Sequence, residues 1–269
     1  MNQNTLGQYY PSGSVIHRLD PRVKLFGVIV FIVALFLCSK WQFVFVTALC
    51  LAAVICASKV PLKHILKQLR FVIVLLLISS VFNLFLTSGT TAVRLGPLEI
   101  TYEGIWRTIY IALRLIMLVM GTSLLTFTST ATELTSGLET ALSILSRAGL
   151  PIHELAMMMS IALRFIPILM EETDKIMKAQ MARGADFESG NIIQKAKSLI
   201  PILVPLFVSA FRRANDLAMA MEARGYHGGE GRTRLKPLEY KRADYIAYTV
   251  LALFVILMFL ASRIRFPGL

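Results

Sequence analysis

Apolar runs of membrane-spanning length constrain this chain more than any other feature of its sequence. The chain has 269 residues, of which 56% are hydrophobic, and about 20 apolar residues of helix cross a hydrocarbon core of about 30 Å. Lipid offers no hydrogen-bond partners, so the backbone groups of such a run must be satisfied inside their own helix. The alternating pattern of a membrane β-barrel is absent. The sequence therefore predicts an all-α polytopic membrane protein.

Five runs are expected to be transmembrane helices. They are residues 23–38, 43–57, 71–86, 104–127 and 243–261. The expected organisation is a membrane domain with four of these helices (1–127), a central region (128–242) and a C-terminal transmembrane helix (243–269). Basic residues before the first run place the N-terminus in the cytoplasm. Five crossings then put the C-terminus outside, a side that Arg263 and Arg265 do not favour.

Start and stop signals mark several helix ends. Asp20 can cap a helix whose first residue is Pro21, the position that proline favours. Thr130 and Glu133 form a capping box, which opens a helix expected to end near Arg147.

Two polar segments are expected to connect the apolar runs, and one cation lies inside a run. Residues 59–70 form a basic linker, and residues 87–103 form an external loop that has one basic residue. Arg114 lies deep in the fourth run, where a charge is costly and faces protein rather than lipid. We interpret it as a structural contact rather than a contact to a membrane partner.

The central region mixes apolar runs with charge. Residues 147–242 hold fifteen Lys and Arg against ten Asp and Glu, a net charge of +5. Residues 152–170 are long enough to span, but they carry charged side chains and Pro167 is expected to interrupt them. Residues 199–211 are apolar but too short to span. This pattern predicts long amphipathic helices on the cytoplasmic face, partly immersed in the lipid headgroups.

One short pattern occurs twice in this region. Ala182-Arg183-Gly184 recurs as Ala223-Arg224-Gly225, at an offset of 41 residues, and the residues before each copy also align. In both copies an apolar residue, an alanine and the arginine share one helix face. An ordinary helix end explains a single copy, because the arginine complements the helix dipole and the glycine can take the left-handed conformation that ends a helix. Two matching copies favour another interpretation, in which each end presents its arginine to an acidic groove on a partner.

Several kinds of chemistry are missing from the sequence. There is no phosphate-binding G-x-x-x-x-G-K-[ST] motif, and the Gly-rich residues 228–233 lack the lysine. No nucleophile, base and acid set is recognisable. The cysteines Cys38, Cys50 and Cys56 lie in apolar runs without metal-ligand spacing. The net charge of +12 is explained by membrane topology rather than by nucleic acid. We expect no catalytic, cofactor-binding or metal site.

At its motifs the chain resembles the transmembrane T component of energy-coupling factor (ECF) transporters, bacterial ABC-type importers of vitamins and metal ions. The resemblance covers essentially the whole chain. It rests on residues 17–25 (HRLDPRVKL), on 149–151 with 163–167, and on 182–184 with 221–226. The paired Ala-Arg-Gly motifs are its specific part.

The resemblance implies a non-catalytic subunit of the bacterial cell membrane. Two cytoplasmic ABC-type ATPases would use ATP, and each would receive one Ala-Arg-Gly end. A separate membrane-embedded S component would capture the substrate. Met157, Met158 and Met159 are candidates for a soft contact with that component, although methionines of this region more often fill gaps in a core. The alternatives are a self-contained secondary transporter and an integral membrane enzyme that modifies lipids.

Overall fold

A computed structural model describes the chain over six stretches. They are residues 9–37, 41–95, 98–146, 151–187, 191–228 and 239–263. Helices dominate them, which confirms the all-α class. The chain forms two compact units, one of Met1–Ala141 with Pro237–Leu269 and the other of Leu142–Lys236. Gly149 and Leu150, which contribute to the family resemblance, lie outside the described residues.

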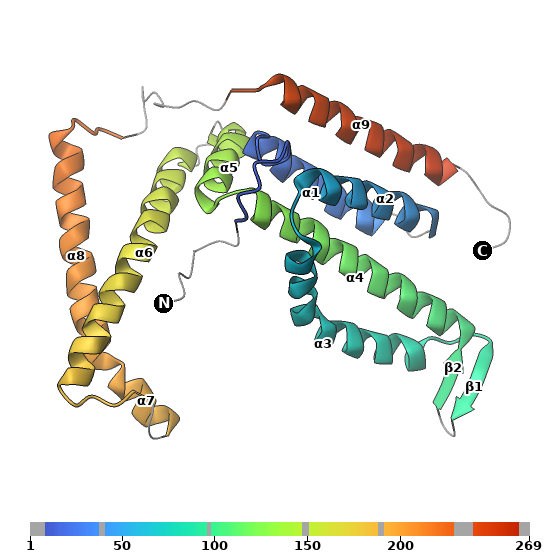
Figure 1. Ribbon diagram of the computed structural model, residues 1–269, viewed down its shortest axis with the longest axis horizontal. Coiled ribbons are helices and arrows are strands. Elements are labelled where there is room, and N and C mark those ends of the chain that lie inside the picture. Colours follow the sequence, from blue (N-terminus) through green and yellow to red (C-terminus); the bar gives the residue numbers. More distant parts are fainter. Residues whose placement is uncertain are drawn as a thin grey trace. The chain divides into compact units, whose positions relative to one another are not determined.

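The first unit contains most of the apolar helices (Figure 1). Its elements are α1 (Pro21–Leu37), α2 (Trp41–Ser58), α3 (Leu62–Leu86), β1 (Thr91–Leu95), β2 (Leu98–Thr101), α4 (Tyr102–Thr128) and α9 (Arg242–Arg263). Helix α5 (Ala131–Ser146) begins in this unit and ends in the second. The five runs expected to span correspond to α1, α2, α3, α4 and α9.

Helix α3 begins nine residues before the expected start. Residues 62–70, expected to be part of a basic linker, are helical, so that expectation is wrong. Ile65, which is fully buried against the core of the unit, explains the difference. The helix bends by 56° between its parts Leu62–Arg70 and Val72–Leu86.

The expected external loop contains a β-hairpin. Strands β1 and β2 pair antiparallel, with Leu95 opposite Leu98. The hairpin leads directly into α4, where the Thr101 hydroxyl accepts a hydrogen bond from the Gly104 amide at 3.1 Å. A sequence of only four or five residues per strand gave no clear alternating signal for it.

Two expected helix starts are confirmed. The Asp20 carboxylate accepts a hydrogen bond from the Arg22 amide at 2.9 Å, next to Pro21 at the first position of α1. At the start of α5 the Glu133 amide donates to the Thr130 hydroxyl at 3.3 Å. The Thr130 amide donates in return to the Glu133 carboxylate at 3.1 Å. Arg147, the expected end of this helix, lies outside the described residues.

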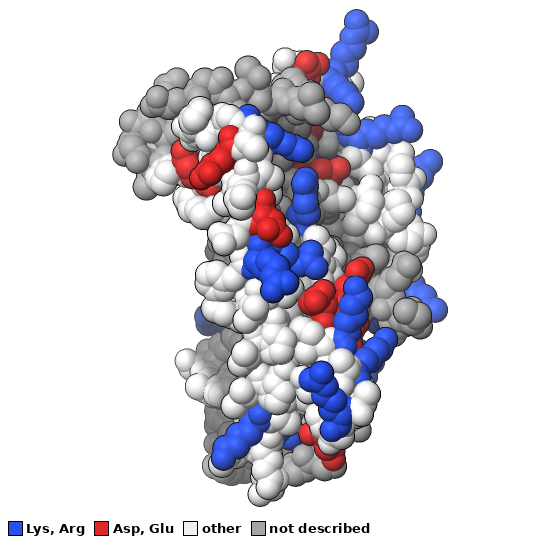
Figure 2. All heavy atoms as spheres, turned by 90° about the vertical axis from the view of Figure 1, so that its left-hand side faces the viewer, with Lys and Arg blue, Asp and Glu red and all other residues white. Residues whose placement is uncertain are grey.

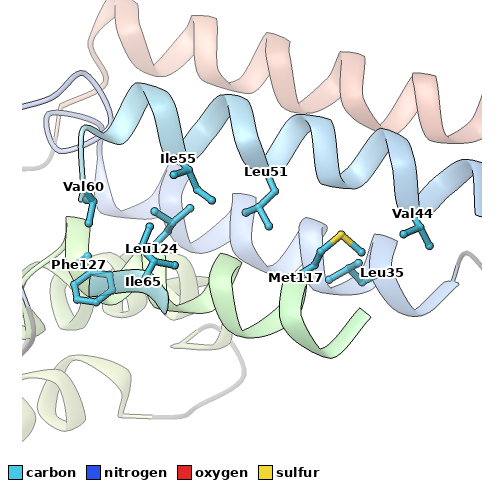
Figure 3. Close-up of a cluster of buried hydrophobic side chains, with 9 residues drawn as sticks. All are labelled: Leu35, Val44, Leu51, Ile55, Val60, Ile65, Met117, Leu124 and Phe127. Carbon is cyan, nitrogen blue, oxygen red and sulfur yellow. The ribbon is translucent and has the colours of Figure 1, made fainter. Parts of the chain in front are cut away.

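A buried apolar cluster joins α1, α2, α3 and α4 (Figure 3). Its members are Leu35, Val44, Leu51, Ile55, Val60, Ile65, Met117, Leu124 and Phe127. A second cluster, made of Phe43, Phe254 and Met258, packs α9 against α2. Because lipid is as apolar as these side chains, close van der Waals packing rather than hydrophobic burial holds such helices together, here supplemented by polar ties.

The polar ties gather several helix termini at one end of the first unit. The Lys24 ammonium donates hydrogen bonds to the carbonyls of His17 (3.0 Å) and Thr128 (2.8 Å). The Asp244 carboxylate accepts from the backbone amide of Asp20 at 2.7 Å. The first residues of α1 and α9 therefore lie together with the last residues of α4, and α1 runs parallel to α9.

Hydropathy and length allow five of the described helices to cross a membrane. These are α2, α4, α6 (Ile152–Ala182), the stretch Ile193–Ala223, and α9, and the bent α3 would make six. The number agrees with the expectation but the membership differs. Helix α1 is not among them; it has 17 residues, which is at the short end of the length that spans a bilayer. Helix α6 and the stretch Ile193–Ala223, which contains α8 (Ile200–Ala223), have 31 residues each, so both are long and apolar enough to span, although residues 199–211 alone are too short.

The second unit consists mainly of α6, α7 (Ile192–Ser198) and α8. Pro167 lies inside α6 and Pro205 inside α8, so the expected interruption at Pro167 is wrong. A proline removes a single amide donor, and the remaining hydrogen bonds and the packing of α6 on α8 keep each helix continuous. The two helices lie side by side and run antiparallel (Figure 1).

Candidate functional site: two arginine-bearing helix ends

The first Ala-Arg-Gly copy ends α6 with a specific backbone motif. Arg183 is the cap residue, and Gly184 follows with φ +87°. The Gly184 amide donates to the Met181 carbonyl, and the Ala185 amide donates to the Gln180 carbonyl, both at 3.0 Å. This pair of hydrogen bonds is the Schellman motif, which requires a left-handed residue and favours glycine there.

The second copy ends α8 in the same way. Arg224 is the cap residue and Gly225 has φ +70°. The Gly225 amide donates to the Glu222 carbonyl at 2.9 Å, and the Tyr226 amide donates to the Met221 carbonyl at 3.0 Å. The left-handed glycines expected from the sequence are therefore confirmed. The repeated sequence encodes a repeated structure, down to the pattern of terminal hydrogen bonds.

All six residues of the two motifs are exposed to solvent. They are Ala182, Arg183, Gly184, Ala223, Arg224 and Gly225. Neither arginine belongs to an ion pair recorded within the described part of the chain. Each guanidinium keeps a planar set of five N–H donors, a geometry suited to a carboxylate. Exposed small residues beside it allow another surface to approach closely.

The antiparallel arrangement separates the two ends. Glu172 in α6 and Arg213 in α8 occupy corresponding positions of the 41-residue offset, and their charged groups lie 3.5 Å apart. Each motif arginine follows its member of this pair by eleven residues (183 − 172 and 224 − 213). At 1.5 Å per residue this is about 16 Å in opposite directions, so the two arginines lie roughly 30 Å apart.

The surroundings of the two ends differ. Toward Arg224 the helices diverge around a cavity of about 700 Å³, whose wall includes Arg164, Tyr226 and His227. A second cavity, of about 280 Å³, continues between the helices. Near the α6 end, the Gln180 amide side chain donates to the Pro201 carbonyl at 3.4 Å and ties the helices together. Sequence reasoning missed these features, because they depend on how the helices pack rather than on the repeat.

Charged side chains are distributed along the exposed face of this unit. Figure 2 shows Lys and Arg from one end of the face to the other, with acidic side chains between them and wide areas without charge. Intermixed charge of this kind differs from the continuous basic surface of a nucleic-acid-binding protein. The exclusion of nucleic acid remains a prediction.

The three candidate methionines face different surroundings. Met158 and Met159 are 54% and 48% exposed. Met157 is half-buried and lines the same cavity as Arg224. Only two of the three therefore present their thioethers to a partner that approaches from outside this unit.

The remaining candidate residues have structural surroundings. Arg114 donates to the Tyr110 hydroxyl at 2.8 Å, and its guanidinium lies over the rings of Tyr110 (4.8 Å) and Phe36 (5.6 Å). This supports its interpretation as a structural contact. The thiols of Cys50 and Cys56 are free, and Cys38 lies outside the described residues. Within the described part of the chain no cluster of His, Cys, Asp and Glu could hold a metal ion.

Comparison with known proteins gives one consistent result. The family model CbiQ, described as cobalt transport protein, matches residues 12–235. The chain is 52% identical to an energy-coupling factor transporter transmembrane protein, EcfT, of Thermosediminibacter oceani, over 95% of this chain and 97% of the relative. It is 44% identical to EcfT of Bacillus subtilis over 97% of this chain and 100% of the relative. A Clostridium kluyveri EcfT is 51% identical, with 97% of both chains covered.

Proposed function

Since the chain belongs to the CbiQ/EcfT family and is the transmembrane component of an energy-coupling factor transporter, we propose that it couples two cytoplasmic ABC-type ATPases to a membrane-embedded S component. ATP-driven motion of the ATPases would pass through α6 and α8 to the protein that captures the substrate. The transported compound would be a vitamin or another micronutrient. The chain itself would hold no ATP and catalyse no reaction.

The observation that carries this proposal is the pair of equivalent arginine ends. Both are exposed, both are fixed by the same backbone motif, and they lie at opposite ends of one antiparallel helix pair. A single partner groove cannot receive two ends that lie roughly 30 Å apart. Two similar grooves, one on each of two related ATPases, match both the repetition and the separation.

The chemistry of docking follows from the exposed guanidinium. When an acidic groove covers Arg183 or Arg224, the charge loses water and must be compensated by carboxylates. Loss of one partner from such an interfacial pair typically costs about 2–5 kcal/mol. The glycine cap prevents the helix from continuing past the arginine, so the guanidinium lies at the tip. Motion of the groove is then transmitted along a continuous helix.

This function sets the location of the two units. The first unit would lie in the bacterial cytoplasmic membrane, and the motif ends of α6 and α8 would reach the cytoplasm, together with the N-terminus. The basic residues near the start of α1 agree with that side, as do Lys59 and the basic first part of α3. Exposed apolar side chains on the first halves of α6 and α8 would face lipid or the S component.

The test replaces each arginine by a residue of opposite charge. Arg183→Glu and Arg224→Glu should each weaken co-purification of the ATPases, and the double variant should lose both the ATPases and substrate uptake. Arg212→Glu is a matched control, because Arg212 is exposed on α8 outside either motif. Normal ATPase binding and uptake in the double variant would refute the proposal.

A second experiment addresses the S component. Met158→Gln and Met159→Gln should weaken co-purification of the S component and leave the ATPases bound, since both side chains are exposed. Met157→Gln is expected to have less effect on the S component, because Met157 faces the cavity beside Arg224. If the two exposed-site variants release the ATPases instead, the surface has been assigned to the wrong partner.

A further inference from the structure

The first unit contains an apolar groove that the coupling function does not use. The groove has a volume of about 340 Å³ and lies among α1, α2, α4 and α9. Lys24 and Thr128 are the two lining residues with nitrogen or oxygen in their side chains. The Lys24 ammonium is already hydrogen-bonded to two carbonyls, and the Thr128 hydroxyl donates to the Leu124 carbonyl at 2.7 Å. The remaining wall offers almost nothing to a polar ligand.

The depth of the groove matches one leaflet of a bilayer. Along α9 its wall extends from Ala243, in the first turn, to Phe254. The eleven residue steps from one to the other cover about 16 Å. Half of a hydrocarbon core of about 30 Å is about 15 Å. A groove of this depth fits an acyl chain that enters from one side of the membrane, and it is too short for a helix that crosses both leaflets.

The mouth of the groove carries positive charge on both walls. Arg18 is exposed and precedes the lining residue Leu19, and Lys241 and Arg242 are exposed and precede the lining residue Ala243. These residues lie at the end of the unit where α1 and α9 begin. The charges are placed where the headgroup of a lipid would lie if its chain occupied the groove.

Two of the acidic residues at the same end, Asp20 and Asp244, are buried, whereas Glu133 and Glu239 are exposed. Asp244 is 1% exposed, and its two carboxylate oxygens accept from the amides of Asp20 and Lys241, both at 2.7 Å. Asp20 is 7% exposed and accepts from the Arg22 amide. Because Asp20 and Asp244 are buried and satisfied by the backbone, they do not offset the exposed cations. Arg18, Lys241 and Arg242 outnumber the two exposed carboxylates, so the surface that a headgroup meets carries a net positive charge.

We propose that this groove binds one anionic phospholipid, with an acyl chain along α9 and the phosphate near Arg18 and Arg242. The apolar wall, the depth of one leaflet and the cationic mouth each match one part of such a molecule. Because the acyl chain of the lipid would occupy the space between α9 and the other helices, the lipid would be a resident component of the unit rather than an exchanging neighbour.

Native mass spectrometry of the purified full-length protein tests this inference. The probes are dioleoyl phosphatidylglycerol and dioleoyl phosphatidylcholine, added in equal amounts to the delipidated protein. One phosphatidylglycerol per chain should be retained. Ile246→Trp should lower retention of both lipids about tenfold, because Ile246 lines the groove and its larger replacement would fill it. Ile256→Trp is the matched control, being on the same helix and similarly exposed (56% against 65%) but outside the groove.

A charge variant tests the headgroup without altering the groove. Arg18→Gln combined with Arg242→Gln should reduce the preference for phosphatidylglycerol about thirtyfold, the ratio that two interfacial cations supply. Arg107→Gln, at the other end of α4, should leave the preference unchanged. Equal retention of both lipids by the unsubstituted protein would overturn the headgroup assignment. Undiminished retention by Ile246→Trp would overturn the groove as the binding site.

Discussion

The contact between Glu172 and Arg213 offers a direct test of how α6 and α8 are held together. The two charged groups are 3.5 Å apart, with side chains 27% and 39% exposed. In bulk water a pair at this distance gains about 1 kcal/mol. Partial exposure keeps the net value in the range of surface pairs, about 0.5–1 kcal/mol. Arg213→Glu replaces this attraction with repulsion, so we expect the α6–α8 contact to weaken by about 1–2 kcal/mol.

Amide hydrogen exchange of the assembled transporter measures this change locally. A loss of 1 kcal/mol accelerates exchange about fivefold wherever opening of the helix pair limits protection. The faster amides should lie near the contact, in the middle of α6 and in the facing part of α8. The swapped variant, Glu172→Arg with Arg213→Glu, restores opposite charges and should recover most of the protection.

A neighbouring pair of residues supplies the control. Glu171 and Arg212 also correspond at the 41-residue offset, but both are exposed and neither belongs to a recorded ion pair within the described residues. Glu171→Arg and Arg212→Glu should therefore change exchange little. The swapped variant is compared with Glu172→Arg alone and Arg213→Glu alone. If its loss of protection equals the sum of the losses in these two single variants, the pair makes no coupled contribution and the reasoning is refuted.

Three further predictions concern single side chains. Gly225→Ala should destabilise the end of α8 by about 1–2 kcal/mol because φ is +70°, whereas Gly225→Asn should cost less; exchange of the last turn measures both. Arg114→Lys should lower the unfolding temperature in detergent, because lysine cannot reproduce the planar contacts with Tyr110, and Arg114→Met serves as the comparison. Gly121→Val should destabilise the α1–α4 contact by about 1–3 kcal/mol, since even a Cβ would overlap Phe31. Thermal unfolding of this variant beside the unsubstituted protein measures the change.

Local signals in the sequence predicted the parts of the fold that depend on nearby residues. The start of α1 at Asp20–Pro21 and the capping box at Thr130 depend on neighbours within a few positions, and both are present. Burial of Ile65 is different, because it depends on residues of α2 and α4 that are distant in sequence. Charge suggested a linker for residues 59–70, and burial of one apolar side chain overrode that suggestion.

The same distinction applies to the candidate site. The repeat predicted two helix ends with left-handed glycines, because a cap is encoded by a few consecutive residues. It could not predict that α6 and α8 would lie antiparallel or that Glu172 would meet Arg213. The signal for that contact is present in the sequence, since the acidic pair Glu171-Glu172 corresponds to the basic pair Arg212-Arg213 at the same offset. Opposite charges at equivalent positions favour contact between the two copies.

Equal caps do not make the two arginines equivalent in their response to mutation. Arg224 shares its cavity with Arg164, whereas the position that corresponds to Arg164 in α8 is Pro205. A glutamate introduced at 224 would therefore face a nearby guanidinium of the same chain, and it could be held against α6 instead of repelling a partner. A glutamate at 183 would have no such cation at the corresponding position. Arg224→Glu combined with Arg164→Gln removes that internal partner, and it should weaken ATPase binding more than Arg224→Glu alone.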